Sequence, residues 1–84
     1  MMNIDVGFKP NYLLFQANTL VDNISYYNSD VSTTTFQYAE RSTTAHTENL
    51  GNTTNGRLKS INSNGFTVNK TGSGDLQLYY FAFE

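Results

Sequence analysis

Few side chains in this sequence could take part in catalysis. The single histidine, His46, lies in a polar stretch rich in Ser, Thr, Asn and Gly, and the chain has no cysteine. A metal site or a general base built on His46 would need a second histidine or a cysteine beside it. Hydroxyls are abundant, but no Gly-x-Ser-x-Gly nucleophile motif occurs. We therefore expect no enzymatic activity, no cofactor and no metal site.

Acidic and amide side chains bracket one predicted turn. Asp22 and Asn23 precede it, and Asn28 and Asp30 form it. Oxygen-rich clusters of this type can hold Ca²⁺, although these residues lack the EF-hand spacing. Asn and Asp are also common at hairpin ends because their side chains bond nearby backbone groups. We interpret these four as turn residues, with a calcium site as the alternative.

The tyrosines offer a second kind of chemistry, which is binding. A tyrosine ring can stack on the apolar face of a sugar while amides and carboxylates bond the sugar hydroxyls. On this basis Tyr26, Tyr27, Asp30 and His46, the last in a predicted exposed loop, are candidate glycan-binding residues. The alternative is that most tyrosines lie in the core or an interface, with their hydroxyls at its rim.

The composition predicts which elements must position these residues. Asn, Thr and Ser make up 29 of the 84 residues, and there are six Tyr and six Phe. Asn favours turns, and Thr and aromatic residues favour strands. The aromatic content also argues against a disordered chain. The sequence therefore predicts an all-β protein.

Length and charge narrow the possibilities further. Eighty-four residues suffice for one domain, residues 1–84. A domain of this size has a thin core, so we expect association with copies of the same chain or with a partner to support it. The five basic residues are scattered in a chain of net charge −2, so we expect no nucleic-acid binding. The N-terminus lacks the pattern of a secretory signal, and no run of about 18 apolar residues predicts membrane insertion.

At least six strands are predicted from alternation and turn signals. They cover Asn11–Ala17, Val21–Asn28, Ser32–Ala39, Arg57–Ile61, Phe66–Val68 and Leu76–Phe83. Asn62-Ser63-Asn64-Gly65 predicts a hairpin with a primed turn, because Asn-Gly accepts positive φ angles. The polar stretch Arg41–Gly56 is predicted to be a long exposed loop.

The last predicted strand decides the architecture. It is apolar on both faces, with Leu76, Leu78, Tyr80 and Ala82 on one and Tyr79, Phe81 and Phe83 on the other. We expect one face to pack on an opposite sheet and the other on a loop or another subunit, since an exposed aromatic strand is prone to aggregate. The prediction is a small antiparallel β-sandwich of jelly-roll or immunoglobulin-like type. Tyr79, Phe81 and Phe83 are its candidate oligomer or capsid interface.

Three segments in order resemble a known group of modules. Gly7-Phe8-Lys9-Pro10 leads into an apolar strand, Asn64-Gly65-Phe66-Thr67-Val68 follows, and Tyr79-Tyr80-Phe81-Ala82-Phe83 ends the sequence. This order, over residues 7–83, resembles the small β-sandwich modules of bacteriophage tail-fibre and receptor-binding proteins. The resemblance implies a virion-surface protein, frequently trimeric, that contacts other virion proteins and recognises host surfaces.

These observations predict a virion-surface structural protein of a bacteriophage. Since the resemblance spans nearly the whole sequence and no shaft segment precedes it, we expect a stand-alone decoration protein of head or tail rather than a fibre tip. Its partners would be other virion proteins, copies of itself, with a trimer favoured, and host-surface glycans. The alternative function is a carbohydrate-binding module unrelated to a virion.

Overall fold

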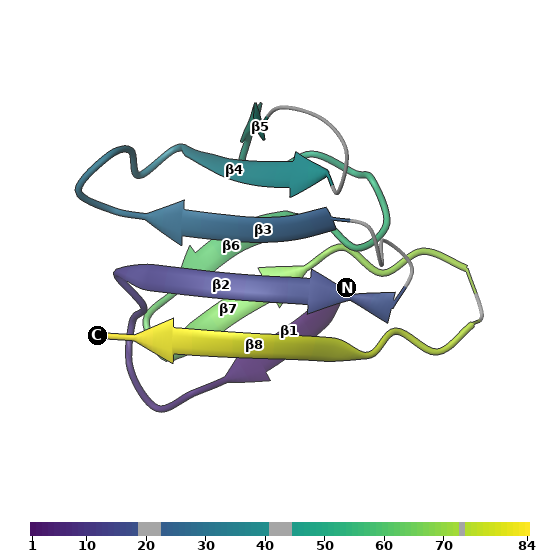
Figure 1. Cartoon of the computed structure of the whole chain (residues 1–84). Coiled ribbons are helices and arrows are strands. Elements are labelled where there is room, and N and C mark those ends of the chain that lie inside the picture. The colour runs from purple at the N-terminus through teal and green to yellow at the C-terminus, as the bar shows by residue number, and fades with distance from the viewer. Residues whose placement is uncertain (19–22, 41–44, 73) are drawn as a thin grey trace.

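The computed structural model describes residues 1–18, 23–40, 45–72 and 74–84, which fold into eight strands (Figure 1). The described residues contain no helix long and apolar enough to span a membrane. The strands are β1 (Met2–Asp5), β2 (Tyr12–Ala17), β3 (Asn23–Asn28), β4 (Thr35–Glu40), β5 (Ala45–Asn49), β6 (Leu58–Asn62), β7 (Gly65–Val68) and β8 (Leu78–Phe83).

The strands form two antiparallel sheets that pack face to face. The larger sheet has five strands in the order β5-β4-β3-β2-β8, and the smaller has three in the order β1-β7-β6. β2 to β5 follow one another as a meander, and β8 returns from the smaller sheet to pair with β2 along its whole length. Figure 1 shows the smaller sheet lying across one face of the larger. The predicted all-β sandwich is confirmed.

One apolar layer lies between the sheets. Leu13, Phe15 and Phe36 from the larger sheet and Phe66 and Val68 from β7 are at most 2% exposed. The rings of Phe15 and Phe66 stack across the layer, with centroids 6.1 Å apart. Alternation along β2 and β4 sends every second side chain into this layer, as expected of strands with one buried face. The core is therefore built from the period-two pattern of the sequence.

Two strands were missed by the sequence prediction. β1 is a short strand at the N-terminus, and β5 lies inside the stretch Arg41–Gly56 that was predicted to be a loop. β5 carries only polar residues and one alanine and forms the polar edge of the larger sheet, with pairs such as Tyr38 opposite His46. An edge strand exposed on both faces has no apolar alternation to reveal it. Residues 41–44 lie outside the described ranges, as does Val21 of the predicted second strand.

Of the two expected covers for the outer face of the last strand, the loop is not found among the described residues, and the other subunit stays a prediction. β8 lies at the edge of the larger sheet, and its outward side chains are not covered by any described loop: Tyr79, Phe81 and Phe83 are 69%, 65% and 56% exposed. Leu76 lies before β8 and is buried in the core. The physical reason is that the three-stranded sheet covers only the inner face of the larger one.

The predicted hairpin between β6 and β7 is confirmed, but its turn type is not. Gly65 pairs with Asn62 and opens β7, and no non-glycine residue described has a positive φ angle, so the turn is not a primed one. Gly65 serves a different purpose. A Cβ atom built on it would lie 1.8 Å from the carbonyl oxygen of Ile4, so glycine allows β1 to approach β7.

We predict that Gly65→Ala destabilises the fold by about 2 kcal/mol or more, because the backbone of β1 would have to move away from β7. Gly74→Ala is the matched control, since its Cβ would meet nothing within 4 Å, and a change within about 0.5 kcal/mol is expected. Urea unfolding followed by circular dichroism measures both. Equal stabilities of the two variants would contradict this explanation.

Candidate functional site

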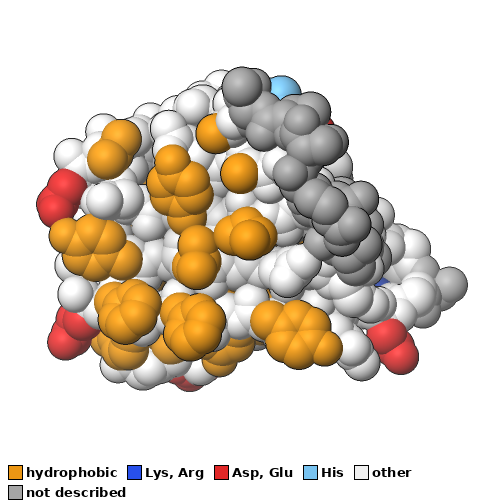
Figure 2. Space-filling model, in the orientation of Figure 1, with side chains coloured by type: hydrophobic (Ala, Val, Ile, Leu, Met, Phe, Trp, Pro, Cys, Tyr) orange, Lys and Arg blue, Asp and Glu red, His pale blue; other side chains and the backbone are white. Residues whose placement is uncertain are grey.

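The outer face of the larger sheet carries most of the exposed large apolar side chains of the described residues. We define the outer apolar face by the seven residues Tyr12, Leu14, Ile24, Tyr26, Tyr79, Phe81 and Phe83, which are between 37% and 69% exposed. Register explains the cluster. Leu14 of β2 lies directly between Tyr26 of β3 and Phe81 of β8, and Tyr12 lies beside Phe83. In Figure 2, which views this face, apolar side chains gather over β2, β3 and β8.

This face carries no formal charge among the described strand residues. The remaining outward positions on the five strands are Gln16, Asn28, Thr35, Gln37, Ala39, Ala45, Thr47 and Asn49. Acidic side chains appear in Figure 2 at the margin of the apolar area rather than within it. Apolar area with a polar rim and no charge at its centre is typical of the buried core of a protein interface.

The face is shaped by two shallow hollows on either side of Leu14. One, of about 220 Å³, lies between Tyr12, Leu14, Tyr26 and Phe83. The other, of about 190 Å³, is bounded by Leu14, Ile24, Tyr79 and Phe81. Such hollows can accept protruding apolar side chains from a partner, as hot-spot residues do in packed interfaces.

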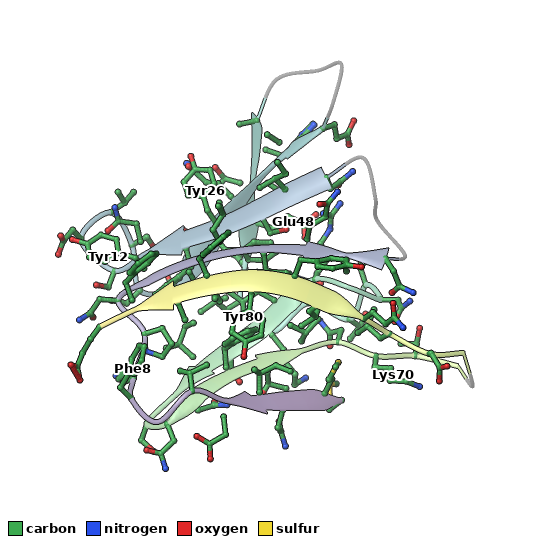
Figure 3. All side chains as sticks on the ribbon, turned by 60° about the horizontal axis from the view of Figure 1, so that its bottom comes forward. Phe8, Tyr12, Tyr26, Glu48, Lys70 and Tyr80 are labelled. Atoms are coloured by element: carbon green, nitrogen blue, oxygen red, sulfur yellow. The ribbon has the colours of Figure 1, made fainter. Side chains whose placement is uncertain are left out.

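Two of the aromatic residues are held in place by their hydroxyls. Tyr12 donates a hydrogen bond of 2.7 Å to Asp30 Oδ2, and Tyr26 donates to Gln37 Oε1. Both rings project from the outer side of the larger sheet in Figure 3, whereas Tyr80 points the other way, between the sheets. Because these hydroxyls are already bonded, Tyr12 and Tyr26 present mainly their rings to a partner.

The structure does not bring the four candidate glycan residues together. Tyr26 and Tyr27 are neighbours in β3 and point to opposite faces, so Tyr26 is exposed while Tyr27 is 4% exposed. Asp30 lies in the turn after β3, where its backbone N–H bonds Asn28 Oδ1. His46 lies on β5, two strands from β3. The opposite directions of Tyr26 and Tyr27 follow from alternation along the strand, whereas the position of His46 depends on β5, which the sequence did not reveal.

His46 is a strand residue, not the loop residue expected. Its ring stacks on Tyr38 at 4.9 Å, and its Nε2 lies 3.8 Å from a Glu40 carboxylate oxygen. The Arg57 guanidinium lies 3.5 Å from the centre of the same Tyr38 ring. These contacts link β4, β5 and the start of β6. They pack the imidazole against side chains of β4.

A pocket of about 370 Å³ opens between the two sheets at one end of the sandwich. We call it the inter-sheet pocket. It is lined by Lys9, Asn11, Tyr27, Ser29, Thr33, Leu50, Gly51, Lys59, Ser60 and Ile61. The lining includes two of the five basic residues of the chain, several hydroxyls and no carboxylate. Its size and its two lysines suit a small anionic ligand.

The calcium alternative finds no support among the residues that the structure describes. They contain no group of three or more His, Cys, Asp or Glu side chains that could hold a metal ion. Asp22 lies outside the described ranges. Asp30 instead accepts the Tyr12 hydroxyl.

Sequence reasoning identified Tyr26, Tyr79, Phe81 and Phe83 but missed the rest of the outer apolar face. Tyr12, Leu14 and Ile24 were assigned to strands without being recognised as surface residues. The signal that could have found them is the apolar character of Tyr12–Ala17 on both faces, which requires a second covering layer. An 84-residue chain with one thin core cannot supply that layer.

Comparison with known proteins gives no match: no protein family, no curated protein and no solved structure is similar to this chain.

Two tyrosines at these sites have raised pKa values. The hydrogen bond to Asp30, followed by the charge of that carboxylate, raises the pKa of Tyr12, and burial raises the pKa of Tyr27. The unfolded chain loses both protons near the ordinary tyrosine pKa of about 10, before the folded chain does. Both groups therefore support folding fully below about pH 10, and this support is lost as the pH rises through their raised pKa values.

We predict that the free energy of unfolding falls above about pH 10 and that Tyr27→Phe makes this fall shallower. Urea unfolding between about pH 8 and 11.5 measures the slope. A variant that loses stability with pH as steeply as the native protein would show that Tyr27 is not the group responsible.

Proposed function

We propose that this protein is a non-enzymatic structural module of a bacteriophage virion surface, which attaches to another virion protein through its outer apolar face. The observation that carries this proposal is the uncharged cluster of seven exposed apolar side chains on one sheet face. The order of the Gly-Phe-x-Pro, Asn-Gly-Phe and terminal aromatic segments is the reason for placing the partner in a virion.

The area of the face supports attachment to a protein. With about 200 Å² for an aromatic side chain, the exposed fractions correspond to roughly 700 Å² of apolar surface. One partner contributes about 800 Å² to a standard interface, whereas the largest patch of an ordinary monomer is about 300–600 Å². A face of this size left in water would make the isolated protein prone to associate.

The first test is the composition of purified particles. Mass spectrometry of virions from a phage that encodes this chain should detect it in a copy number similar to those of capsid or tail proteins. Absence from purified particles would reject the proposed location.

The second test concerns the face itself. We predict that Phe81→Glu lowers incorporation into particles about tenfold or more, because a carboxylate would be buried without a partner. Ser63→Glu adds the same charge at the exposed turn between β6 and β7 and should incorporate normally. Immunoblots of particles assembled with each tagged variant measure this. Equal incorporation of the two would show that the outer apolar face is not the attachment surface.

The inter-sheet pocket supports a second candidate function, which is binding of an acidic sugar. Lys9 and Lys59 can neutralise a carboxylate or sulfate, and the hydroxyl of Thr33 can bond a sugar hydroxyl. Tyr27 reaches the pocket from the core side, and its hydroxyl has no hydrogen-bond partner among the described residues. Burial raises its pKa above the ordinary tyrosine value of about 10, at which the hydroxyl is already a protonated donor at neutral pH.

A glycan array that includes sialylated, uronic-acid and sulfated sugars tests this function. We expect binding to acidic sugars that Lys59→Gln weakens about tenfold, since one charge-assisted hydrogen bond is worth about 1.5–3 kcal/mol. Lys70→Gln removes a lysine that does not line the pocket and is the matched control. Silence of the native protein across the array would reject sugar binding without affecting the attachment proposal.

A further inference from the structure

One edge of the larger sheet presents unpaired backbone groups. The carbonyls of Gln77 and Phe83 accept hydrogen bonds from Asn18 and Asn11, so the odd-numbered residues of this segment direct their backbone groups toward β2. Backbone direction alternates along a strand. The N–H and C=O groups of Leu78, Tyr80 and Ala82 therefore point away from β2, where the described residues provide no further strand.

This edge lacks the features that normally prevent strand pairing. Natural sheets protect their edges with charged residues, proline, bulges or a covering segment. β8 has the sequence Leu-Tyr-Tyr-Phe-Ala-Phe, with no charge, proline or glycine, and its register with β2 runs without a shift over six pairs. In Figure 3 no described segment runs in front of β8. The free edge is thus long, regular and apolar.

Exposure on the outer apolar face is greatest at this same edge. Tyr79, Phe81 and Phe83 of β8 are 56% to 69% exposed, whereas the face residues of β2 and β3 are 37% to 48% exposed. Side chains of an internal strand have neighbours on both sides, and those of β8 have neighbours only on β2. The most exposed aromatic residues are therefore those that an added strand would flank.

We propose that β8 pairs antiparallel with β8 of a second copy of this chain, about a two-fold axis that passes beside Tyr80. This register places Tyr80 opposite Tyr80 of the second copy. Leu78 of each copy lies opposite Ala82 of the other. All three free positions of each copy are then paired, and each pair exchanges two backbone hydrogen bonds. A register shifted by one residue cannot form. It would place residues whose backbone groups point to the free edge opposite residues whose backbone groups point to β2 of their own chain.

The side chains fit this register. Tyr79 of each copy lies opposite Phe81 of the other, which gives two equivalent aromatic pairs. Aromatic cross-strand pairs are among those that stabilise sheets. The charged residues nearest to β8 along the sequence, Asp75 and Glu84, lie outside the strand, so no like charges face each other within the paired strands. The two five-stranded sheets would become one continuous sheet with a single outer apolar face.

The available area indicates a dimer of moderate affinity. At about 200 Å² per aromatic side chain, Tyr79, Tyr80, Phe81 and Phe83 expose roughly 460 Å² per copy. Pairing of the edges covers only the part of this surface that faces the partner strand, so the buried area stays below the 1,200–2,000 Å² or so of a standard interface. Dimerisation should therefore depend on concentration. It does not rest on the proposed function, because a monomer could attach to a virion through the same face.

Cysteine cross-linking tests the register directly, because the natural chain contains no cysteine. In Tyr80→Cys the two thiols lie opposite each other, with Cα atoms about 5.5 Å apart, which a disulfide can span. In Tyr79→Cys and Phe81→Cys the two introduced cysteines are offset along the strands by about two residues. Their Cα atoms are then roughly 8 Å apart, which is too far for a disulfide. Under mild oxidation we expect about tenfold more cross-linked dimer for Tyr80→Cys. Equal yields for the three variants, or no dimer from any, would overturn the proposal.

A backbone substitution provides an independent test if loss of the Tyr80 ring perturbs folding. Ala82→Pro removes an N–H that points to the free edge and spares the ladder with β2, whereas Ala82→Ser keeps that N–H. Light scattering coupled to size exclusion over a range of concentrations should show a native dimer that Ala82→Ser retains and that Ala82→Pro weakens about tenfold or more. A native monomer, a native trimer or a dimer that survives Ala82→Pro would each overturn it. Particle incorporation of Ala82→Pro shows separately whether attachment needs the dimer.

Discussion

The contact between Phe15 and Phe66 represents the constraint on which the rest of the structure depends. These rings stack where the two sheets face each other, and Leu13, Phe36 and Val68 are buried in the same layer. In so small a chain this single layer supplies nearly all of the hydrophobic stabilisation. It also determines which side chains of β2, β3 and β4 point inward. Once alternate residues point into the layer, the residues between them must point outward.

The outer apolar face follows from an imbalance between the sheets. The larger sheet has five strands and the smaller has three. The three-stranded sheet can cover only the inner face of the larger one. β2 and β8 are apolar on both sides, so their second set of side chains reaches water in the single chain. Sequences of this kind occur normally in strands that are buried on both faces. The fold thus contains half of an interface whose other half comes from outside the chain.

The polar half of the composition has an equally physical role. Asn69 is fully buried, and its side-chain amide bonds the carbonyls of Asn52 and Arg57, which closes the long connection after β5 onto the start of β6. Thr67 and Asn62 form a chain of hydrogen bonds on the outer side of the smaller sheet, which reaches Asn3 of β1. Asn and Thr side chains therefore hold strand ends and loops that the small core does not reach. This leaves the inter-sheet pocket bordered by ordered polar segments.

The two surfaces differ in what they could recognise. The outer apolar face is broad, uncharged and nearly flat, which suits another protein surface. The inter-sheet pocket is concave and lined by lysines and hydroxyls. They lie on different sides of the larger sheet, because Tyr26 and Tyr27 point in opposite directions from β3. A single molecule could therefore attach through one surface while the other remains open to a ligand.

Local patterns in the sequence were sufficient for the class of fold, six of the strands and the hairpin closed by Gly65. Alternation and turn chemistry act over a few residues, so they can be read without knowing the partner strands. The place of each strand in its sheet was decided only in three dimensions. β8 became one edge of the larger sheet, β5 became the polar edge that carries His46, and Tyr27 turned inward to the pocket. These outcomes depend on pairings between residues that are distant in the sequence. They also depend on the smaller sheet, which covers only one face of the larger sheet.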